Sequence, residues 1–345
     1  MTALAGLSAE QEGRLSRWIA DHLGIEDCRV AQALSGGNAN LTLLLAAGEQ
    51  RLVLRTPPEN AISPVAHRGI ERESKVLGAL QGRARVPDVL GWCDDVEVLG
   101  RPFLLVSHVD GVALTDALPE AYAPGSATVS RLGEELIDEL AVIQAQPWRD
   151  IGLADMGNPE NFLERQIARW RGIRAETSVR SLVQLDELGE WLLHNIPPAG
   201  PVGIVHGDYH LDNTLVQRDQ PRLAAVIDWE LATIGDPLVD LALMLMFWGP
   251  REVDPPGFEH VQAVSRQDGV VSRQVLAQRW SSATGHSIEN LNFYMCFAFW
   301  RLAAIVEGAY VLYREGKVDT PYARGLEYDV PALLQEAAAA AQGRW

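Results

Sequence analysis

Three oxygen-bearing side chains, Asp208, Asn213 and Asp228, stand at short gaps in the second half of the chain. Asp208 follows a His-Gly pair, and Asp228 ends an apolar run and is followed by Trp-Glu. Phosphoryl transfer from a nucleotide needs one carboxylate to orient the attacking hydroxyl, plus an amide oxygen and a second carboxylate to hold Mg²⁺. The pattern predicts this chemistry, with Asp208 as the base and Asn213 and Asp228 as the metal ligands.

Each of these residues also has an ordinary structural interpretation. Asp208 could cap a turn, Asn213 could be a turn amide, and Asp228 could cap the loop after its strand. The five-residue gap between Asp208 and Asn213 equals the Asp-to-Asn gap of the protein-kinase catalytic loop, which favours the catalytic interpretation. We expect His206 to organise the loop rather than to transfer protons.

Other polar residues near the motif have weaker signals. His210 and Asp212 lie inside it, and we expect them to be solvated or to face the substrate. Glu230 is a further candidate for the substrate site. Asp236 fits better as the N-cap of the next helix. Asp240, one turn into that helix, is expected to brace the catalytic loop by hydrogen bonds.

A glycine-rich turn between two predicted strands contains Gly36, Gly37, Asn38 and Asn40. Glycines let the backbone approach phosphates, and exposed amides can bind them. Two glycines between strands usually mean only a hairpin, and no Gly-Lys-Ser/Thr of the Walker type follows. The later motif of Asp208, Asn213 and Asp228 favours nucleotide binding as the role of this turn.

Arg55 ends the third predicted strand, where a kinase places the lysine that contacts the phosphates of the nucleotide. Glu73, on the following predicted helix, is placed to pair with it. An arginine could do both jobs, although its planar fork differs from an ammonium group. The alternative is an ordinary exposed charge, and Arg51 and Arg72 compete for the role.

The apolar pattern predicts two unlike parts, an α+β, bilobal, protein-kinase-like fold with a small antiparallel-sheet N-lobe and a mostly helical C-lobe. The predicted N-lobe, residues 1–109, binds the nucleotide; the C-lobe, residues 110–345, carries the catalytic loop, the metal site and the acceptor site. The N-lobe elements are helices at 9–23 and 64–81 and strands at 28–34, 41–47, 51–55, 88–93 and 102–109. The C-lobe elements are helices at 128–146, 159–176, 181–195, 236–248, 271–284 and 288–316 and strands at 202–206, 214–217 and 223–228.

The composition is that of a soluble enzyme, with 345 residues, 47% of them hydrophobic and 22% charged. The formal charge of −17 argues against nucleic acid or an anionic membrane as partner and permits a cationic substrate. Three scattered cysteines predict no disulfide framework or zinc site. Apolar runs such as 241–248 are too short to span a bilayer, and no signal peptide opens the chain. We therefore expect a cytoplasmic protein; its oligomeric state stays open.

The last long helix carries an aromatic stripe that is typical of core packing. Arg301 is a polar member of this helix. It either faces the substrate or makes a structural ion pair.

Together these motifs resemble the aminoglycoside phosphotransferase/choline kinase family, which has a protein-kinase-like fold. The residues that carry the resemblance are His206-Gly207-Asp208 with Asn213, Ile227-Asp228-Trp229-Glu230, Gly235-Asp236-Pro237 and Asp240-Leu241-Ala242. The chain is most similar to the branch related to the kinase domain of certain acyl-CoA dehydrogenases, which shows a Leu-Arg-x-x-Pro strand, here at Arg55, and an arginine corresponding to Arg301.

The resemblance implies ATP or GTP with Mg²⁺, and adenine bound near Ser107 and Val109. It also implies Arg55 in place of the usual lysine. A hydroxyacyl-CoA-like or other amphiphilic acceptor is favoured by the branch. The alternatives are an aminoglycoside or amino-alcohol kinase and, from another class, a nucleotide-binding pseudokinase with a regulatory role.

Overall fold

A computed structural model describes residues 6–34, 40–58, 64–114, 117–177, 180–254, 256–258 and 263–345. The predicted phosphate-turn residues Gly36, Gly37 and Asn38 lie outside these ranges. The chain groups into two compact units. The first comprises Met1–Gly111, Pro147–Met156 and Ala224–Ala232, and the second Val112–Gln146, Gly157–Leu223 and Thr233–Trp345. The predicted lobe boundary at residue 109 stays a prediction, because this grouping also assigns two later segments to the first unit.

The first unit is built on a five-stranded sheet with the order β1-β2-β3-β5-β4, in which all neighbours are antiparallel. This confirms the predicted antiparallel sheet. Leu54 in the middle of β3 lies opposite Leu43 on one side and Leu105 on the other. The strands are β1 (Arg29–Ala33), β2 (Leu41–Ala47), β3 (Gln50–Thr56), β4 (Val89–Cys93) and β5 (Phe103–Ser107).

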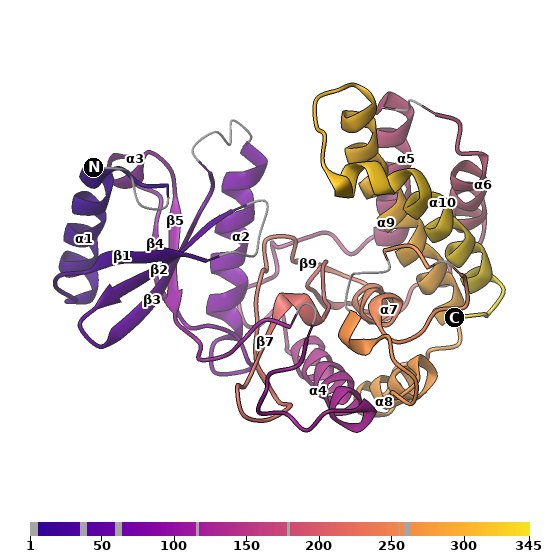
Figure 1. Ribbon diagram of the computed structural model, residues 1–345, viewed down its shortest axis with the longest axis horizontal. Coiled ribbons are helices and arrows are strands. Elements are labelled where there is room, and N and C mark those ends of the chain that lie inside the picture. The colour runs from indigo at the N-terminus through magenta and orange to yellow at the C-terminus, as the bar shows by residue number, and fades with distance from the viewer. Residues whose placement is uncertain are drawn as a thin grey trace. The chain divides into compact units, whose positions relative to one another are not determined.

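Two helices cover the two faces of this sheet, α1 (Ala9–Leu23) and α2 (Pro64–Leu80) (Figure 1). Ser8 caps α1, since its hydroxyl accepts a hydrogen bond from the Gln11 backbone N–H. The Gln11 side-chain oxygen in turn accepts a hydrogen bond from the Ser8 backbone N–H, which completes a capping box. The apolar side of α1 buries Leu15 and Ile19 in the core of the unit. The sequence did not indicate the short helix α3 (Val96–Leu99), which Asp95 caps. A four-residue helix has too little periodicity to recognise.

The second unit is mainly helical (Figure 1). Its helices are α4 (Ser126–Gln144), α5 (Phe162–Thr177), α6 (Val183–His194), α7 (Leu238–Phe247), α8 (Arg273–Thr284), α9 (Leu291–Arg314) and α10 (Pro321–Ala341), with short 3₁₀ turns η1 (Leu211–Asn213) and η2 (Ala263–Ser265). Its short strands are β6 (Gly203–Val205), β7 (Thr214–Val216) and β9 (Thr233–Gly235), and β6 pairs antiparallel with β9. Strand β8 (Leu223–Val226) begins in the second unit and continues into the first.

Helix α9 packs against α10 and α7 in the middle of the second unit. By length and composition it is the one helix among the described residues that could cross a membrane, with a mean hydropathy of 1.5 over its most apolar window. The sequence analysis considered only short continuous apolar runs and therefore did not identify this helix. About 67% of that window is buried inside the protein, as in the core helix of a folded domain, so this is weak evidence for a membrane span.

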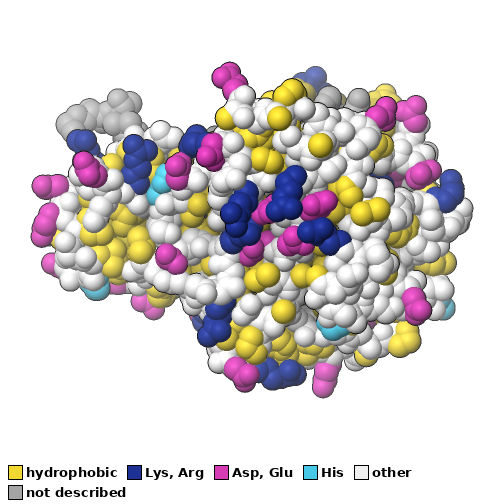
Figure 2. All heavy atoms as spheres, turned by 90° about the horizontal axis from the view of Figure 1, so that it is seen from below, with side chains coloured by type: hydrophobic (Ala, Val, Ile, Leu, Met, Phe, Trp, Pro, Cys, Tyr) yellow, Lys and Arg dark blue, Asp and Glu magenta, His cyan; other side chains and the backbone are white. Residues whose placement is uncertain are grey.

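Helices α4 and α8 are joined by ion pairs near the surface. Arg279 on α8 contacts Asp138 at 2.6 Å and Glu134 at 3.8 Å, and both carboxylates belong to α4. Acidic and basic side chains lie beside one another in the middle of the face shown in Figure 2. Pairs this exposed contribute about 0–1 kcal/mol each, so packing rather than charge holds the two helices.

We expect Gly133→Ala to destabilise the protein, because Gly133 lies where α4 meets Trp248. A Cβ at Gly133 would stand 2.5 Å from the Trp248 ring, and that ring is fully buried with its N–H donated to the Val271 carbonyl at 2.8 Å. Such overpacking costs about 1–3 kcal/mol. Urea unfolding should therefore show a lower midpoint.

The matched control is Gly13→Ala on α1, where an added Cβ meets nothing within 4 Å. This exposed helical position should gain about 0.5–1 kcal/mol. Equal gains at Gly13 and Gly133 would contradict the packing argument.

Candidate active site

The catalytic-loop motif follows strand β6. Asp208 and Asn213 are joined through the Asn213 side-chain amide, which donates to the Asp208 carbonyl and to Asp208 Oδ2, both at 2.8 Å. The amide N–H groups of Asn213 are thus used inside the loop, and its side-chain oxygen is the atom that a metal would need. Asp212 precedes it in η1 and is half-buried.

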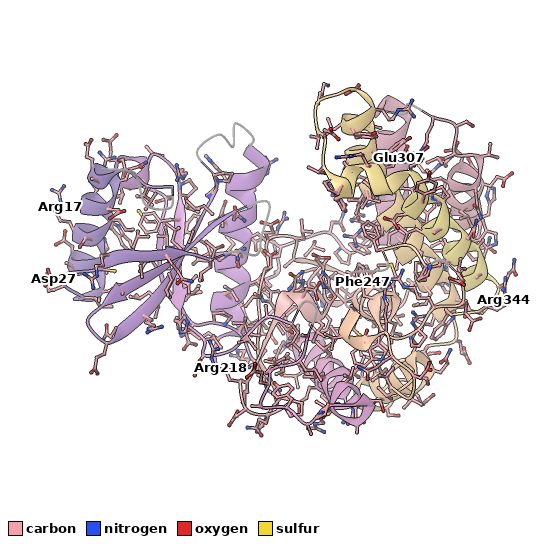
Figure 3. The ribbon with its side chains drawn as sticks, viewed as in Figure 1. Arg17, Asp27, Arg218, Phe247, Glu307 and Arg344 are labelled. Carbon is pink, nitrogen blue, oxygen red and sulfur yellow. The ribbon has the colours of Figure 1, made fainter. Side chains whose placement is uncertain are left out.

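His210 lies against the predicted base. Its Nε2 is 3.4 Å from Asp208 Oδ1, and its ring packs on Phe247, labelled in Figure 3, with centroids 5.0 Å apart. The His210 side chain is only 12% exposed, so the expectation of a solvated position is wrong for this residue. The contact with Phe247 could not be predicted from the sequence, since the two residues are brought together only by folding.

Asp208 is ionised at neutral pH. Burial acts to raise the pKa of its carboxyl, but the hydrogen bond and charge of His210, helped by His206 and Asn213, lower that pKa to about 2. A carboxylate with this pKa can accept a hydrogen bond from a hydroxyl over the whole physiological range.

Both backbone polar groups of Gly207 are held by side chains. Asp240 accepts hydrogen bonds from the backbone N–H of His206 at 2.6 Å and of Gly207 at 2.9 Å. Arg301 donates from Nη2 to the Gly207 carbonyl at 2.9 Å. The φ of 89° at this position suits glycine. The expectation that Asp240 braces the loop is confirmed, and Arg301 holds the next peptide through the Gly207 carbonyl.

Two buried carboxyls give stability an unusual pH dependence. Burial raises the pKa of Asp240 to about 7, against the lowering effect of the two backbone N–H groups, and burial also raises the pKa of Glu336 on α10 to about 7. Because the folded-state pKa values exceed the ordinary ones, the native state holds these protons more tightly. Their stabilisation is lost as the pH rises through about 7.

Between pH 6 and pH 8 we expect each of these two groups to reduce the free energy of unfolding by about 1 kcal/mol. Asp208, with its lowered pKa, contributes nothing in this window. Thermal unfolding at constant ionic strength measures the effect, and Asp240→Asn and Glu336→Gln should each flatten the profile. An unfolding temperature that climbs from pH 6 to pH 8 would refute the assignment.

In the first unit, Arg55 bridges two carboxylates. Its Nε is 2.8 Å from Glu73 Oε2, and its Nη2 is 2.7 Å from Asp228 Oδ1. Burial acts to lower the pKa of Arg55, but the charges of Glu73 and Asp228 outweigh it and raise that pKa. The predicted pairing with Glu73 is confirmed. Of the competitors, Arg51 is exposed and Arg72 donates to the Glu230 carbonyl at 3.2 Å.

Asp228 has a backbone φ of 68°, in the left-handed region that aspartate tolerates better than most residues. Its Oδ1 contacts Arg55, and its side chain is 24% exposed, which leaves Oδ2 for a metal. Among the described residues no group of three or more His, Cys, Asp or Glu could hold a metal alone. Mg²⁺ needs only one or two protein oxygens besides phosphates and water, so Asp228 and Asn213 have suitable chemistry.

The remaining predicted nucleotide and substrate residues fall into two places in the first unit. Asn40, directly after the glycine-rich turn, donates from Nδ2 to the Glu230 carboxylate. Ser107 ends β5, and its hydroxyl accepts a hydrogen bond from the Asp88 backbone at 2.9 Å, so this side chain supports the strand end. Val109 follows β5 and is half-buried.

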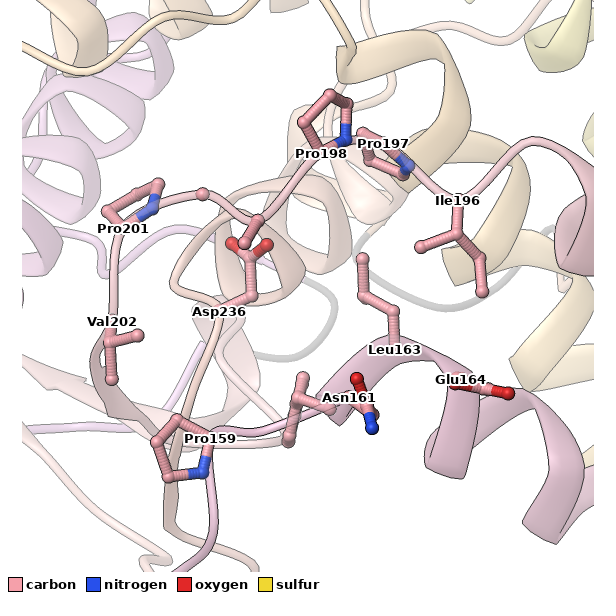
Figure 4. A pocket seen from close by; sticks show the side chains of 13 residues that line it. Pro159, Asn161, Leu163, Glu164, Ile196, Pro197, Pro198, Pro201, Val202 and Asp236 are labelled. Atoms are coloured by element: carbon pink, nitrogen blue, oxygen red, sulfur yellow. The ribbon is translucent and has the colours of Figure 1, made fainter.

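A pocket in the second unit lies beside Asp236 (Figure 4). The carboxylate of Asp236 accepts hydrogen bonds from the Tyr294 hydroxyl at 2.6 Å and from the Leu238 backbone at 3.0 Å, so its role is structural. The predicted N-cap position is one residue off, because α7 begins at Leu238 and Pro237 occupies the N-cap position. The pocket holds about 180 Å³, below the roughly 300–1,000 Å³ of ordinary ligand pockets. We do not assign the acceptor to it. Its walls include Pro159, Leu163, Ile196, Pro197, Pro198, Pro201 and Val202.

Comparison with known proteins agrees with this architecture. Acyl-CoA dehydrogenase family member 11 of Gallus gallus is 32% identical over 288 residues, which is 82% of this chain and 36% of that protein. The chain thus spans little more than a third of the length of this relative. A Ralstonia eutropha JMP134 crystal structure with a provisional aminoglycoside phosphotransferase assignment is 28% identical, with a TM-score of 0.81 over 96% of this chain and 98% of that chain.

An aminoglycoside phosphotransferase in complex with GDP and kanamycin shares the fold at 17% identity, with a TM-score of 0.63 over 94% of this chain and 98% of that one. The sequence profile described as "Phosphotransferase enzyme family" matches residues 30–269. That match covers more than half of the chain. The chain therefore belongs to the phosphotransferase enzyme family.

Proposed function

We propose that the chain transfers the γ-phosphate of ATP or GTP to a hydroxyl group of a small molecule, with Mg²⁺, in the cytoplasm. The observation that carries this proposal is the state of Asp208. It is ionised, contacted by His210 and Asn213, and part of a loop whose backbone is held by Asp240. Family membership supports the same reaction class.

In the proposed reaction the acceptor hydroxyl donates a hydrogen bond to Asp208. As the hydroxyl oxygen forms its bond to the γ-phosphorus, the bond from that phosphorus to the β,γ-bridging oxygen breaks, and the nucleoside diphosphate leaves with the bond electrons. The hydroxyl proton passes to the Asp208 carboxylate. Because its pKa is low, this carboxylate is a weak base. It first accepts a hydrogen bond that positions the hydroxyl, and it takes the proton only late in the transfer.

We assign the metal to Asn213 and Asp228, and phosphate contacts to Arg55 and the turn that ends at Asn40. Bound Mg²⁺ would neutralise charge on the phosphates. Arg55 is charged and pre-oriented by Glu73, as a phosphate-binding group must be. We propose the first unit as the nucleotide lobe and the second as the acceptor lobe, with adenine near Ser107 and Val109.

For the acceptor we favour a hydroxylated acyl-CoA-like or other amphiphilic compound. The argument is that the relatives at 30–32% identity carry names of the acyl-CoA dehydrogenase family, whereas the kanamycin-bound structure is only 17% identical. His210, Asp212 and Glu230 are the proposed acceptor-side residues. An aminoglycoside or amino-alcohol kinase is the second candidate, consistent with the net charge of −17.

The test is nucleoside diphosphate release by the purified chain with Mg²⁺ and ATP or GTP. The acceptor panel should contain hydroxyacyl-CoA thioesters, kanamycin, choline and ethanolamine. Turnover with the thioesters alone supports the favoured acceptor, and turnover with the cationic compounds supports the second. If nucleotide raises the unfolding temperature but no acceptor is turned over, the chain is a regulatory pseudokinase rather than an enzyme.

A further inference from the structure

Two residues of the segment that carries Asp228 are tied to neighbouring strands of the first unit. Asp228 Oδ1 lies 2.7 Å from Nη2 of Arg55 on β3, and the Glu230 carboxylate accepts a hydrogen bond from Nδ2 of Asn40. Asn40 directly precedes β2, in which Thr42 lies opposite Arg55. Both anchors therefore stand at the same end of the β2–β3 pair.

Helix α2 holds the same segment from another direction. Arg72 on this helix donates from Nη1 to the Glu230 carbonyl at 3.2 Å. A Cβ at Gly69, also on α2, would stand 3.5 Å from the Glu230 Cβ, so the helix and the segment are in van der Waals contact. The Asn40 contact adds the start of β2 to these anchors.

The Asn40 side chain is paired at one end only. The residue is 8% exposed, and its Oδ1 is buried and makes no hydrogen bond among the described residues. Because a carboxylate is an acceptor, the amide must turn its nitrogen towards Glu230 and its oxygen away. Buried polar atoms are almost always paired, and an exception calls for an explanation. Stability alone does not explain a contact that leaves the amide oxygen without a donor.

The position of this contact offers an explanation. Arg55, the proposed phosphate contact, touches Asp228, the proposed metal ligand, and the charges of Glu73, Asp228 and Glu230 all act on Arg55. A shift of Glu230 would move the segment that sets the direction of the Asp228 carboxylate. Groups that orient a metal ligand without touching the metal typically change its affinity by about 10–100-fold.

We propose that the hydrogen bond between Asn40 and Glu230 is a positioning contact that couples Mg²⁺ binding at Asp228 to nucleotide binding at Arg55. This inference rests on the proposed function. It concerns one oxygen of Glu230 and leaves the acceptor-side role of that residue in place. Coupling between two ligands is reciprocal, so the contact increases the factor by which Mg²⁺ tightens nucleotide binding and the factor by which nucleotide tightens Mg²⁺ binding.

Isothermal titration with ATP tests the coupling, once with excess Mg²⁺ and once with EDTA, at constant ionic strength. The measured quantity is the ratio of the Kd in EDTA to the Kd in Mg²⁺. Asn40→Leu nearly keeps the volume of the side chain but removes the amide, and it should lower this ratio about tenfold. The matched control is Glu71→Gln on α2, an exposed carboxylate 3.2 Å from Lys75, which should keep the wild-type ratio.

An exchange of the two side chains separates the hydrogen bond from general effects on the fold. Asn40→Asp sets two carboxylates against each other, so it should lower the ratio as Asn40→Leu does. The double variant Asn40→Asp/Glu230→Gln has the net charge of the wild type and restores an amide-to-carboxylate hydrogen bond with donor and acceptor reversed. Its ratio should return to within about threefold of the wild-type value, since the two residues are in direct contact.

A wild-type ratio in both single Asn40 variants overturns the coupling, also when their unfolding temperatures fall, because the contact would then be structural only. A double variant that is no better than Asn40→Asp overturns it as well. If Asn40→Leu does not fold, Asn40→Asp and the double variant decide. A wild type that binds no nucleotide overturns the proposed function together with this inference, whereas normal nucleotide binding with an unchanged ratio overturns the coupling alone.

Discussion

Asp208→Asn is expected to lower kcat by about 10²–10⁴-fold, the range for loss of a general base, with only a modest fall in the unfolding temperature from the lost charge contact with His210. The substituted amide keeps the shape of the side chain, and its oxygen can still accept from Asn213. It loses the negative charge that orients the hydroxyl and receives the proton. Rates at saturating nucleotide and acceptor, with a thermal unfolding scan, measure both effects.

The matched control is Asp219→Asn, an exposed carboxylate in the turn after β7. Its kcat should equal that of the wild type. If Asp208→Asn retained full turnover, the assignment of the base would fail, and with it the proposed reaction. A large fall in unfolding temperature would instead show that Asp208 acts mainly through loop structure, because its side chain contacts Asn213 and His210 of the same loop.

Arg55→Met is expected to reduce the free energy of unfolding by about 3–5 kcal/mol, the cost of removing one partner of a buried ion pair. The change leaves Glu73, which is 2% exposed, without its cation, and leaves Asp228 without its Oδ1 contact. Because burial raises the pKa of Glu73, its carboxyl can take up a proton as the pH falls. The destabilisation should therefore be larger at pH 8 than at pH 6.

The double variant Arg55→Met/Glu73→Gln is the control for this mechanism. It removes the Glu73 carboxylate that Arg55→Met leaves buried without a cation. The double variant should therefore recover part of the lost stability although it has one more substitution. Arg55→Lys keeps a charge but offers one nitrogen in place of the fork, and it should bind nucleotide more weakly than the wild type. A double variant that is less stable than Arg55→Met at pH 8 would contradict the buried-charge explanation.

Much of the fold follows from local sequence. Ser8 caps α1 as its residue type predicts, and short apolar runs between turn residues indicate the strands of the first unit. The spacing of Asp208, Asn213 and Asp228 indicated the reaction class, because side-chain chemistry and short gaps are properties of the chain itself.

Tertiary structure alone decided which charges meet. The sequence left Arg51, Arg55 and Arg72 as rivals, and folding brought Arg55 to Asp228 across 173 positions. It likewise brought Arg301 to the Gly207 carbonyl across 94 positions and set Arg251 beside Glu336. Local patterns depend on contacts within a few residues, whereas pairing and pKa depend on burial and on partners supplied by distant segments, and these exist only once the chain is packed.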